Sequence, residues 1–124
     1  MAETLFEKIW RAHVVREFGD RALIHIDRHM VHEGTSRNAF DGLRSRKRGV
    51  KNLELTFGVI DHDPSTLPGR TAQTYEPSRE RIGAMQENCH EFGIKLFDVN
   101  DPDQGIVHVI STEQGIVLPG MTVA

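Results

Sequence analysis

The feature that most constrains the fold is an alternation, along the 124-residue chain, of short apolar segments with segments of helical period. The short segments are rich in branched residues and are bounded by charged or turn residues, which is typical of strands. Strands that alternate with helices favour an α/β layer with a mainly parallel sheet, in which functional residues collect where strands end. Three helices are predicted: Leu5–Val15, a segment capped at Thr35 or Ser36, and Arg79–Phe92. A turn at 17–20 ends the first of them. The predicted strands are Ala22–Asp27, Leu53–Ile60 and Ile94–Phe97.

The clearest helix is predicted at residues 79–92. Ile82, Met85, Cys89 and Phe92 recur at helical spacing, and Gly93 stands where a left-handed residue commonly ends a helix. Cys89 lies on this apolar stripe and is therefore predicted to be a buried packing residue.

Three regions carry weaker patterns. Residues 61–77 hold three of the five prolines, which predicts a long loop, and long loops in compact domains are often functional. Gly105–Ile110 is apolar apart from its histidine, so its type stays ambiguous on pattern alone. The last ten residues form two short apolar pieces around a Pro-Gly turn, and the final piece has the pattern of a strand.

Composition disfavours several classes of partner. Fifteen basic against 18 acidic residues give a formal net charge of −3, so no overall positive field attracts nucleic acid. A single cysteine cannot by itself make a disulfide or an iron–sulfur site, which favours a reducing, cytoplasmic compartment. No apolar run approaches the roughly 18 residues that span a bilayer, so no membrane partner is expected.

Histidine stands beside carboxylate at two predicted strand ends, 27–32 and 61–63. An aspartate beside a histidine can fix the imidazole tautomer and raise its proton affinity, which suits a general acid that protonates a leaving hydroxyl. Asp61 and His62 are therefore candidate catalytic residues. The alternative is that the two side chains point to opposite faces of a strand, with His62 a solvent-exposed loop residue.

The first of these clusters contains metal-ligand types. Asp27, His29, His32 and Glu33 lie within seven residues, but their histidines lack the i,i+4 spacing of a zinc helix motif. Metal binding is therefore only weakly indicated.

Arg28 and His108 each allow two interpretations. Arg28 could bind a carboxylate as a fork, or it could form a surface salt bridge with a neighbouring acid. His108, in an otherwise apolar stretch, is either a satisfied core residue or a catalytic one.

An ordered series of short motifs runs through the whole chain. It consists of Thr4-Leu-Phe-Glu-Lys-Ile, Ala12-His-Val-Val, Ile26-Asp-Arg-His-Met-Val-His-Glu, Thr35-Ser with Ala39-Phe-Asp-Gly-Leu-Arg, Asp61-His62, Asn88-Cys with Glu91-Phe-Gly, Gln104-Gly-Ile-Val-His-Val, Glu113-Gln-Gly and Leu118-Pro-Gly-Met-Thr-Val. This series closely resembles the N-terminal region of the large subunits of 3-isopropylmalate dehydratases (isopropylmalate isomerases), which belong to the aconitase family. Blocks in one register over the whole chain are a stronger signal than any single block.

The resemblance implies an aconitase-like three-layer α/β domain, of which residues 1–124 are an incomplete N-terminal part that stops before the cluster-binding region. It implies a hydro-lyase that interconverts 2- and 3-isopropylmalate in leucine biosynthesis through a dehydrated intermediate. It also implies that Gly105–Ile110 contains the start of a helix and not a strand.

The resemblance also assigns roles to single residues. Asp61 and His62 match the pair that assists the leaving hydroxyl, and His108 matches a catalytic histidine that pairs with an aspartate further along in the family. His32 falls where a side chain contacts substrate in the wider family. Arg28 is the substrate-binding candidate beside it, on its residue type and not on the resemblance.

Cofactor and partners follow from the same resemblance. Such enzymes hold a four-iron, four-sulfur (4Fe–4S) cluster on three cysteines, and Cys89 does not match a cluster ligand. The isolated chain is therefore expected to bind no cluster and to be inactive. The expected partners are the remainder of the large subunit, a small subunit that completes a heterodimer, and a small-molecule 2-hydroxy diacid.

Departures from the family pattern leave alternatives open. Gly34, Asp63-Pro64 and Thr112 differ from the usual residues, which puts the preferred substrate in question more than the type of reaction. One alternative is a related hydro-lyase that acts on another 2-hydroxy diacid, such as homoaconitate or a methylated malate. Another is a non-catalytic α/β module that binds a carboxylate or a divalent metal through Asp27, Arg28, His29, His32 and His62.

Overall fold

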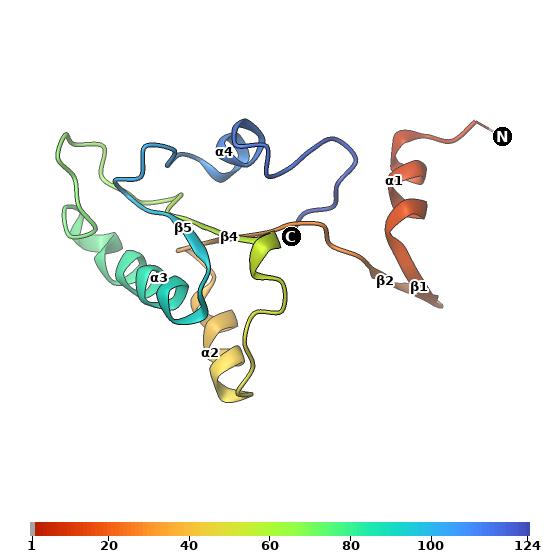
Figure 1. Cartoon of the computed structure of the whole chain (residues 1–124), viewed down its shortest axis with the longest axis horizontal. Helices are drawn as coiled ribbons and strands as arrows, with labels where there is room; N and C mark the ends of the chain where they lie inside the picture. Colours follow the sequence, from red (N-terminus) through yellow and green to blue (C-terminus); the bar gives the residue numbers. More distant parts are fainter. Residues whose placement is uncertain (1) are drawn as a thin grey trace.

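A parallel sheet of three strands lies at the centre of the structure, a computed structural model that describes residues 2–124 (Figure 1). The strands are β3 (His29–His32), β4 (Thr56–Val59) and β5 (Lys95–Phe97), in the order β3-β4-β5. Both neighbouring pairs are parallel. The carboxyl ends of all three strands therefore meet at one edge of the sheet.

Helices cover both faces of this sheet, with α2 and α3 on one side and α4 on the other (Figure 1). Successive strand residues point to opposite faces. Val59 accordingly packs in the cluster that contains Ile110, whereas the next residue, Ile60, packs in the cluster that contains Ile82. The predicted α/β class, with three layers and a mainly parallel sheet, is confirmed. The helices are α2 (Arg37–Ser45), α3 (Arg79–Phe92) and α4 (Val107–Glu113).

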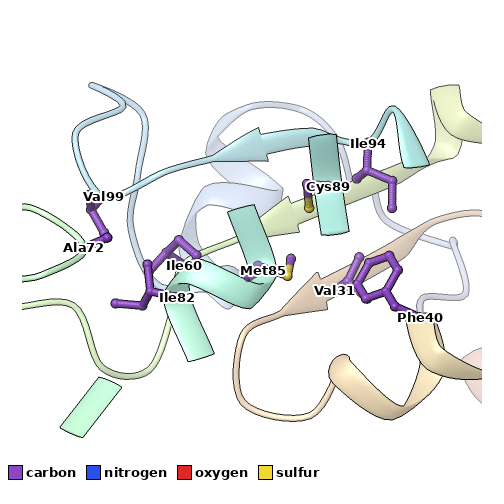
Figure 2. Close-up of a cluster of buried hydrophobic side chains, with 9 residues drawn as sticks. All are labelled: Val31, Phe40, Ile60, Ala72, Ile82, Met85, Cys89, Ile94 and Val99. Atoms are coloured by element: carbon purple, nitrogen blue, oxygen red, sulfur yellow. The ribbon is translucent and has the colours of Figure 1, made fainter. Parts of the chain in front are cut away.

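The larger buried cluster lies between the sheet and the pair α2 and α3 (Figure 2). Its α3 members Ile82, Met85 and Cys89 are 1–2% exposed, and Gly93 ends the helix in the left-handed region at φ 72°. The predicted helix at 79–92 is confirmed at both ends. Burial raises the pKa of the Cys89 thiol to about 12, as expected for a packing residue.

Gly58 lets α3 approach the sheet closely. A Cβ atom at this position of β4 would lie 2.7 Å from Sγ of Cys89 and 2.9 Å from Cε of Met85. Both contacts are shorter than a Cβ tolerates, so the close packing of helix on strand requires glycine here.

An N-terminal arm stands beside the three-layer body (Figure 1). It begins with α1 (Leu5–His13), whose first turn has a capping box between Thr4 and Glu7. The helix ends two residues earlier than predicted, because the β-branched pair at 14–15 starts β1 (Val14–Phe18). The predicted turn at 17–20 is shorter, and Gly19 at φ 62° supplies it.

The predicted strand Ala22–Asp27 is wrong in length and in partner. Strand β2 (Arg21–Ile24) pairs with β1 in an antiparallel hairpin, outside the parallel sheet. The strand that enters the parallel sheet is β3, which sequence reasoning took for residues beyond a strand end. Its sequence His-Met-Val-His has only one buried residue, Val31, so no apolar run indicates a strand here.

The remaining elements adjust the predicted bounds. The predicted strand Leu53–Ile60 opens with a 3-10 turn (Leu53–Leu55) before β4, and β5 starts one residue later than expected. The loop at 61–77 is irregular up to a second 3-10 turn (Glu76–Ser78). Helix α4 begins at Val107, as the family resemblance implied for this ambiguous segment.

The last residues extend the sheet beyond β3. Val123 forms a parallel bridge with Arg28, and the amide of Met30 donates to the carbonyl of Ala124 at 2.8 Å. The final piece, predicted to be a strand, therefore pairs with β3 only through an isolated bridge and forms no strand of its own within residues 2–124. Within residues 2–124, no helix has the length and apolar character needed to cross a membrane.

Three residues join the arm, the entry to β3 and the C-terminal piece. The Asp27 carboxylate accepts from Nε2 of His13 at 2.7 Å and from the amide of Thr122 at 2.8 Å. Nδ1 of His13 lies 2.7 Å from the carbonyl of Ile9, so the imidazolium form can donate at both nitrogens. The bond to Ile9, with a smaller effect of Asp27, raises the pKa of His13, and the amide of Thr122 lowers the pKa of Asp27.

This joint makes the attachment of the arm depend on pH. Because the pKa of His13 is raised in the folded state, its stabilisation is complete below the unfolded value of 6.5 and is lost as pH rises through the folded pKa. We predict slower amide exchange in β1 and β2 at about pH 5.5 than at about pH 8.5, after correction for intrinsic exchange rates. The substitution His13→Ala should remove this difference.

The exposed His29, which follows the joint in the chain, provides the matched control. His29→Ala should keep the pH dependence of exchange in the hairpin. Equal protection of the wild-type hairpin at both pH values would contradict the role of His13.

Candidate functional site

The candidate site lies at the carboxyl edge of the sheet, where β3 and β4 end side by side. His32 is the last residue of β3 and pairs with Val59, the last residue of β4. Asp61 and His62 follow β4 after one further buried residue, Ile60. Parallel pairing therefore brings residues 32 and 61–62 together, although about thirty positions separate them in the sequence.

Asp61 is held from two sides. Its side chain is 7% exposed, and its Oδ1 accepts from the amide of Val107, the first residue of α4, at 2.6 Å. Its Oδ2 lies 3.2 Å from Nδ1 of His62. A carboxylate on Nδ1 favours the tautomer that carries the proton there and directs the opposite nitrogen outward.

The His62 ring is held by Asp61 on one side and reaches solvent on the other. Its side chain is 53% exposed, whereas that of Asp61 is nearly buried. The two side chains contact each other, since both follow the strand in a turn and do not alternate within it. Such a pair can hand a proton to a group that approaches from solvent.

His32 lies against His62. The ring centroids are 4.3 Å apart, and the planes are inclined by 23°. Nδ1 of His32 accepts from the amide of Gly34 at 3.2 Å, and the hydroxyl of Thr35 lies 3.4 Å from Nε2. The stacked pair places two imidazoles at the same edge of the sheet.

Glu33 supports the turn that carries Asp61 and His62. This carboxylate is 3% exposed and accepts from the amides of Asp61 at 2.9 Å, His62 at 2.6 Å and Asp63 at 3.1 Å. Sequence reasoning marked Glu33 only as a metal-ligand type. Its role could have been inferred from an acidic residue at the end of one strand and a polar turn after the neighbouring strand. That inference requires that β3 is first recognised as a strand.

The geometry argues against a metal centre on these residues. Ligand atoms of His32, Glu33 and His62 lie within 4.8 Å of one another. However, imidazole lone pairs lie in the ring plane, so two nearly parallel stacked rings do not direct them at one point. Backbone amides also use three of the four lone-pair sites of the Glu33 carboxylate.

Arg28 is not part of this cluster. It precedes β3, so roughly 13 Å of strand separates it from His32 at about 3.3 Å per residue. Its guanidinium donates to the carbonyl of Asp27 at 2.7 Å. For the same reason, the structure does not gather the five-residue carboxylate or metal site formed by Asp27, Arg28, His29, His32 and His62.

His108 lies beside a groove that also reaches His32. It is exposed in the first turn of α4, so it is not the satisfied core residue that one interpretation expected. The groove is open, has a volume of about 500 Å³ and is mostly apolar. Its lining consists of Met30, His32, Val107, His108, Ser111, Val117, Val123 and Ala124.

The model of the Aconitase family (aconitate hydratase) matches residues 7–124. The chain belongs to the aconitase family. The match includes His32, Glu33, Asp61 and His62 at the sheet edge, and membership places the chain among hydro-lyases.

The family generally binds a 4Fe–4S cluster, and the residues of this chain do not fit that group. Cluster irons need thiolate ligands. The chain has one cysteine, which is 2% exposed against Gly58, and burial raises the pKa of its thiol to about 12. Cys89 is therefore a packing residue on the sheet face and not a cluster ligand.

The bond from Val107 to Asp61 predicts a measurable loss of stability. In Asp61→Ala, the first amide of α4 and Nδ1 of His62 lose their acceptor, so the free energy of unfolding should fall by about 1–3 kcal/mol in urea titrations. Asp61→Asn keeps an oxygen for the helix amide and should lose less than half as much. Equal losses in the two variants would refute this account of the helix anchor.

Proposed function

We propose that this chain contributes the acid side of a 3-isopropylmalate dehydratase site, the large-subunit activity that interconverts 2- and 3-isopropylmalate in leucine biosynthesis. The observation that carries the proposal is the Asp61–His62 pair: a nearly buried carboxylate 3.2 Å from Nδ1 of a half-exposed imidazole, at the edge where parallel strands end. Membership of the aconitase family supports the reaction type, hydration and dehydration of a hydroxy acid.

The proposed acid step uses the outward nitrogen of His62. In the imidazolium form, Nε2 gives its proton to the substrate hydroxyl as the C–O bond breaks, and the hydroxyl leaves as water. The carboxylate of Asp61 stabilises the imidazolium before transfer and keeps the ring oriented afterwards. The carbon-bound proton is removed by a base on another part of the assembled enzyme. Reversal of these steps at the neighbouring carbon returns water to the double bond.

His32 and His108 are proposed to contact the substrate beside this pair. His32 stacks on His62, and both His32 and His108 line the groove at the sheet edge. Neutral or protonated imidazoles donate hydrogen bonds to carboxylates, which suits a diacid. Arg28 is left out of the proposed site because it lies at the opposite end of β3.

The apolar part of the groove supports a substrate with a branched alkyl group. Met30, Val107, Val117 and Val123 line it next to the two histidines. Burial of an isopropyl group contributes about 0.8 kcal/mol per carbon, which favours isopropylmalate over a diacid with a smaller substituent. A related hydro-lyase on homoaconitate or a methylated malate is the alternative that a substrate panel separates.

The proposal requires further polypeptide. Cluster thiolates and the base must come from outside residues 2–124, and we assign them to the remainder of a large subunit and to a small subunit. The N-terminal arm supports this assignment, because exposed apolar groups gathered on one element often mark a protein interface. Leu5, Phe6, Val15, Phe18 and Leu23 are each more than half exposed on α1 and the hairpin.

The test uses the full chain, assembled with the polypeptides that complete the enzyme, in an assay of isopropylmalate isomerisation. His62→Asn should lower kcat by about 10²- to 10⁴-fold, because the proton donor is lost. His90→Asn, at an exposed histidine in the last turn of α3, is the matched control and should leave kcat unchanged. An active His62→Asn enzyme, or a wild-type preference for another diacid over isopropylmalate, would contradict the proposal.

A further inference from the structure

Three consecutive amides converge on one buried side chain beneath the proposed acid pair. Glu33 accepts from Asp61 on Oε2, and from His62 and Asp63 on Oε1. Loop amides are ordinarily satisfied by water or by local turn bonds. A carboxylate that directly follows a different strand, β3, instead fixes the direction of the whole turn.

We propose that Glu33 is a positioning residue for the hydro-lyase site: its carboxylate clamps the turn at residues 61–63, so that His62 keeps Nδ1 on Asp61 and turns Nε2 outward. The catalytic meaning of this clamp rests on the function proposed above. The hydrogen bonds from Glu33 to the turn do not depend on that function, because they lie within residues 33–63.

The clamp is rigid at both of its ends. Glu33 directly follows His32, the last residue of β3, whose backbone is paired with β4. The turn that it holds is fixed again by side chains, because Asp61 accepts from α4 and Asp63 pairs with Arg81 of α3. The turn therefore connects the two layers of helices, and Glu33 ties it to the sheet between them.

The same contact couples the two stacked histidines. His32 lies next to Glu33 in the chain, and the backbone amide of His62 is bonded to Glu33 at 2.6 Å. The neighbours His32 and Glu33 at the end of β3 therefore position both rings of the stack: His32 supplies one ring, and Glu33 holds the backbone of the other. The ring centroids are 4.3 Å apart. Small displacements of a catalytic group lower the reaction rate by large factors. Glu33 should therefore affect kcat more than KM.

Glu33→Gln is the variant that isolates the clamp. It preserves size and one oxygen, but an amide NH₂ replaces one of the two acceptors, so at least one of the three backbone donors loses its partner. Glu87→Gln makes the same chemical change at an exposed site on α3 and is the matched control.

The first measurement needs no variant. Amide exchange in the wild-type chain, followed by NMR, should be at least about tenfold slower at residues 61–63 than at the exposed loop residues Thr66 and Gly69. Exchange at the unprotected rate for all three amides would overturn the proposal.

The second measurement compares the variants. In Glu33→Gln, exchange at residues 61–63 should rise at least about tenfold while that of β4 is unchanged, and the ring ¹⁵N signals of His62 should shift from the tautomer protonated at Nδ1 to a mixture. Glu87→Gln should match the wild type in both readouts. Wild-type exchange and an unchanged tautomer in Glu33→Gln would overturn the proposal.

The third measurement concerns turnover in the assembled enzyme. Glu33→Gln should lower kcat by about tenfold or more with KM within about twofold, because geometry for proton transfer is lost while substrate contacts remain. An unchanged kcat would overturn the catalytic part. If the wild-type enzyme does not act on isopropylmalate at all, the proposed function fails, whereas the exchange and tautomer results still decide whether Glu33 holds the turn.

Discussion

Four residues of β3 pair in parallel with four residues of β4, and this pairing sets where every residue of the site lies. Because the two strands run in the same direction, the segments after both of them emerge at one edge of the sheet. His32 and Glu33 come from one strand end, and Asp61 and His62 come from the other. A shift of one residue in the register would send Val31 out of the core and Glu33 away from the turn that it holds.

The same strand joins the rest of the chain to the sheet. On its outer side β3 accepts the C-terminal piece around Val123, and at its entry Asp27 joins that piece to His13 of the arm. One end of β3 is thus a structural junction, and the other end carries the candidate chemistry. Arg28, predicted beside His32, lies at the junction end of β3, where its guanidinium donates to the carbonyl of Asp27.

The sequence predicts correctly those helices and strands whose bounds follow from their own pattern of apolar and terminating residues. The helix at 79–92 has an apolar stripe and a terminating glycine, and its bounds were predicted correctly. Strand β3 was missed because pairing on both sides, and not an apolar run, makes it a strand. The Asp61–His62 pair was predicted from adjacency and family resemblance. The clamp from Glu33 could not be predicted, since it depends on a contact across 28 positions or more that only the strand pairing creates.

We propose above all that the outward nitrogen of His62 protonates the hydroxyl of a diacid held at the carboxyl edge of the sheet. A structure of the assembled enzyme with a bound hydroxy diacid tests this claim most directly. We expect the substrate hydroxyl oxygen to lie about 3 Å from Nε2 of His62, with the alkyl group in the groove beside Met30 and Val107. A diacid bound away from this edge, or with its hydroxyl out of reach of His62, would contradict it.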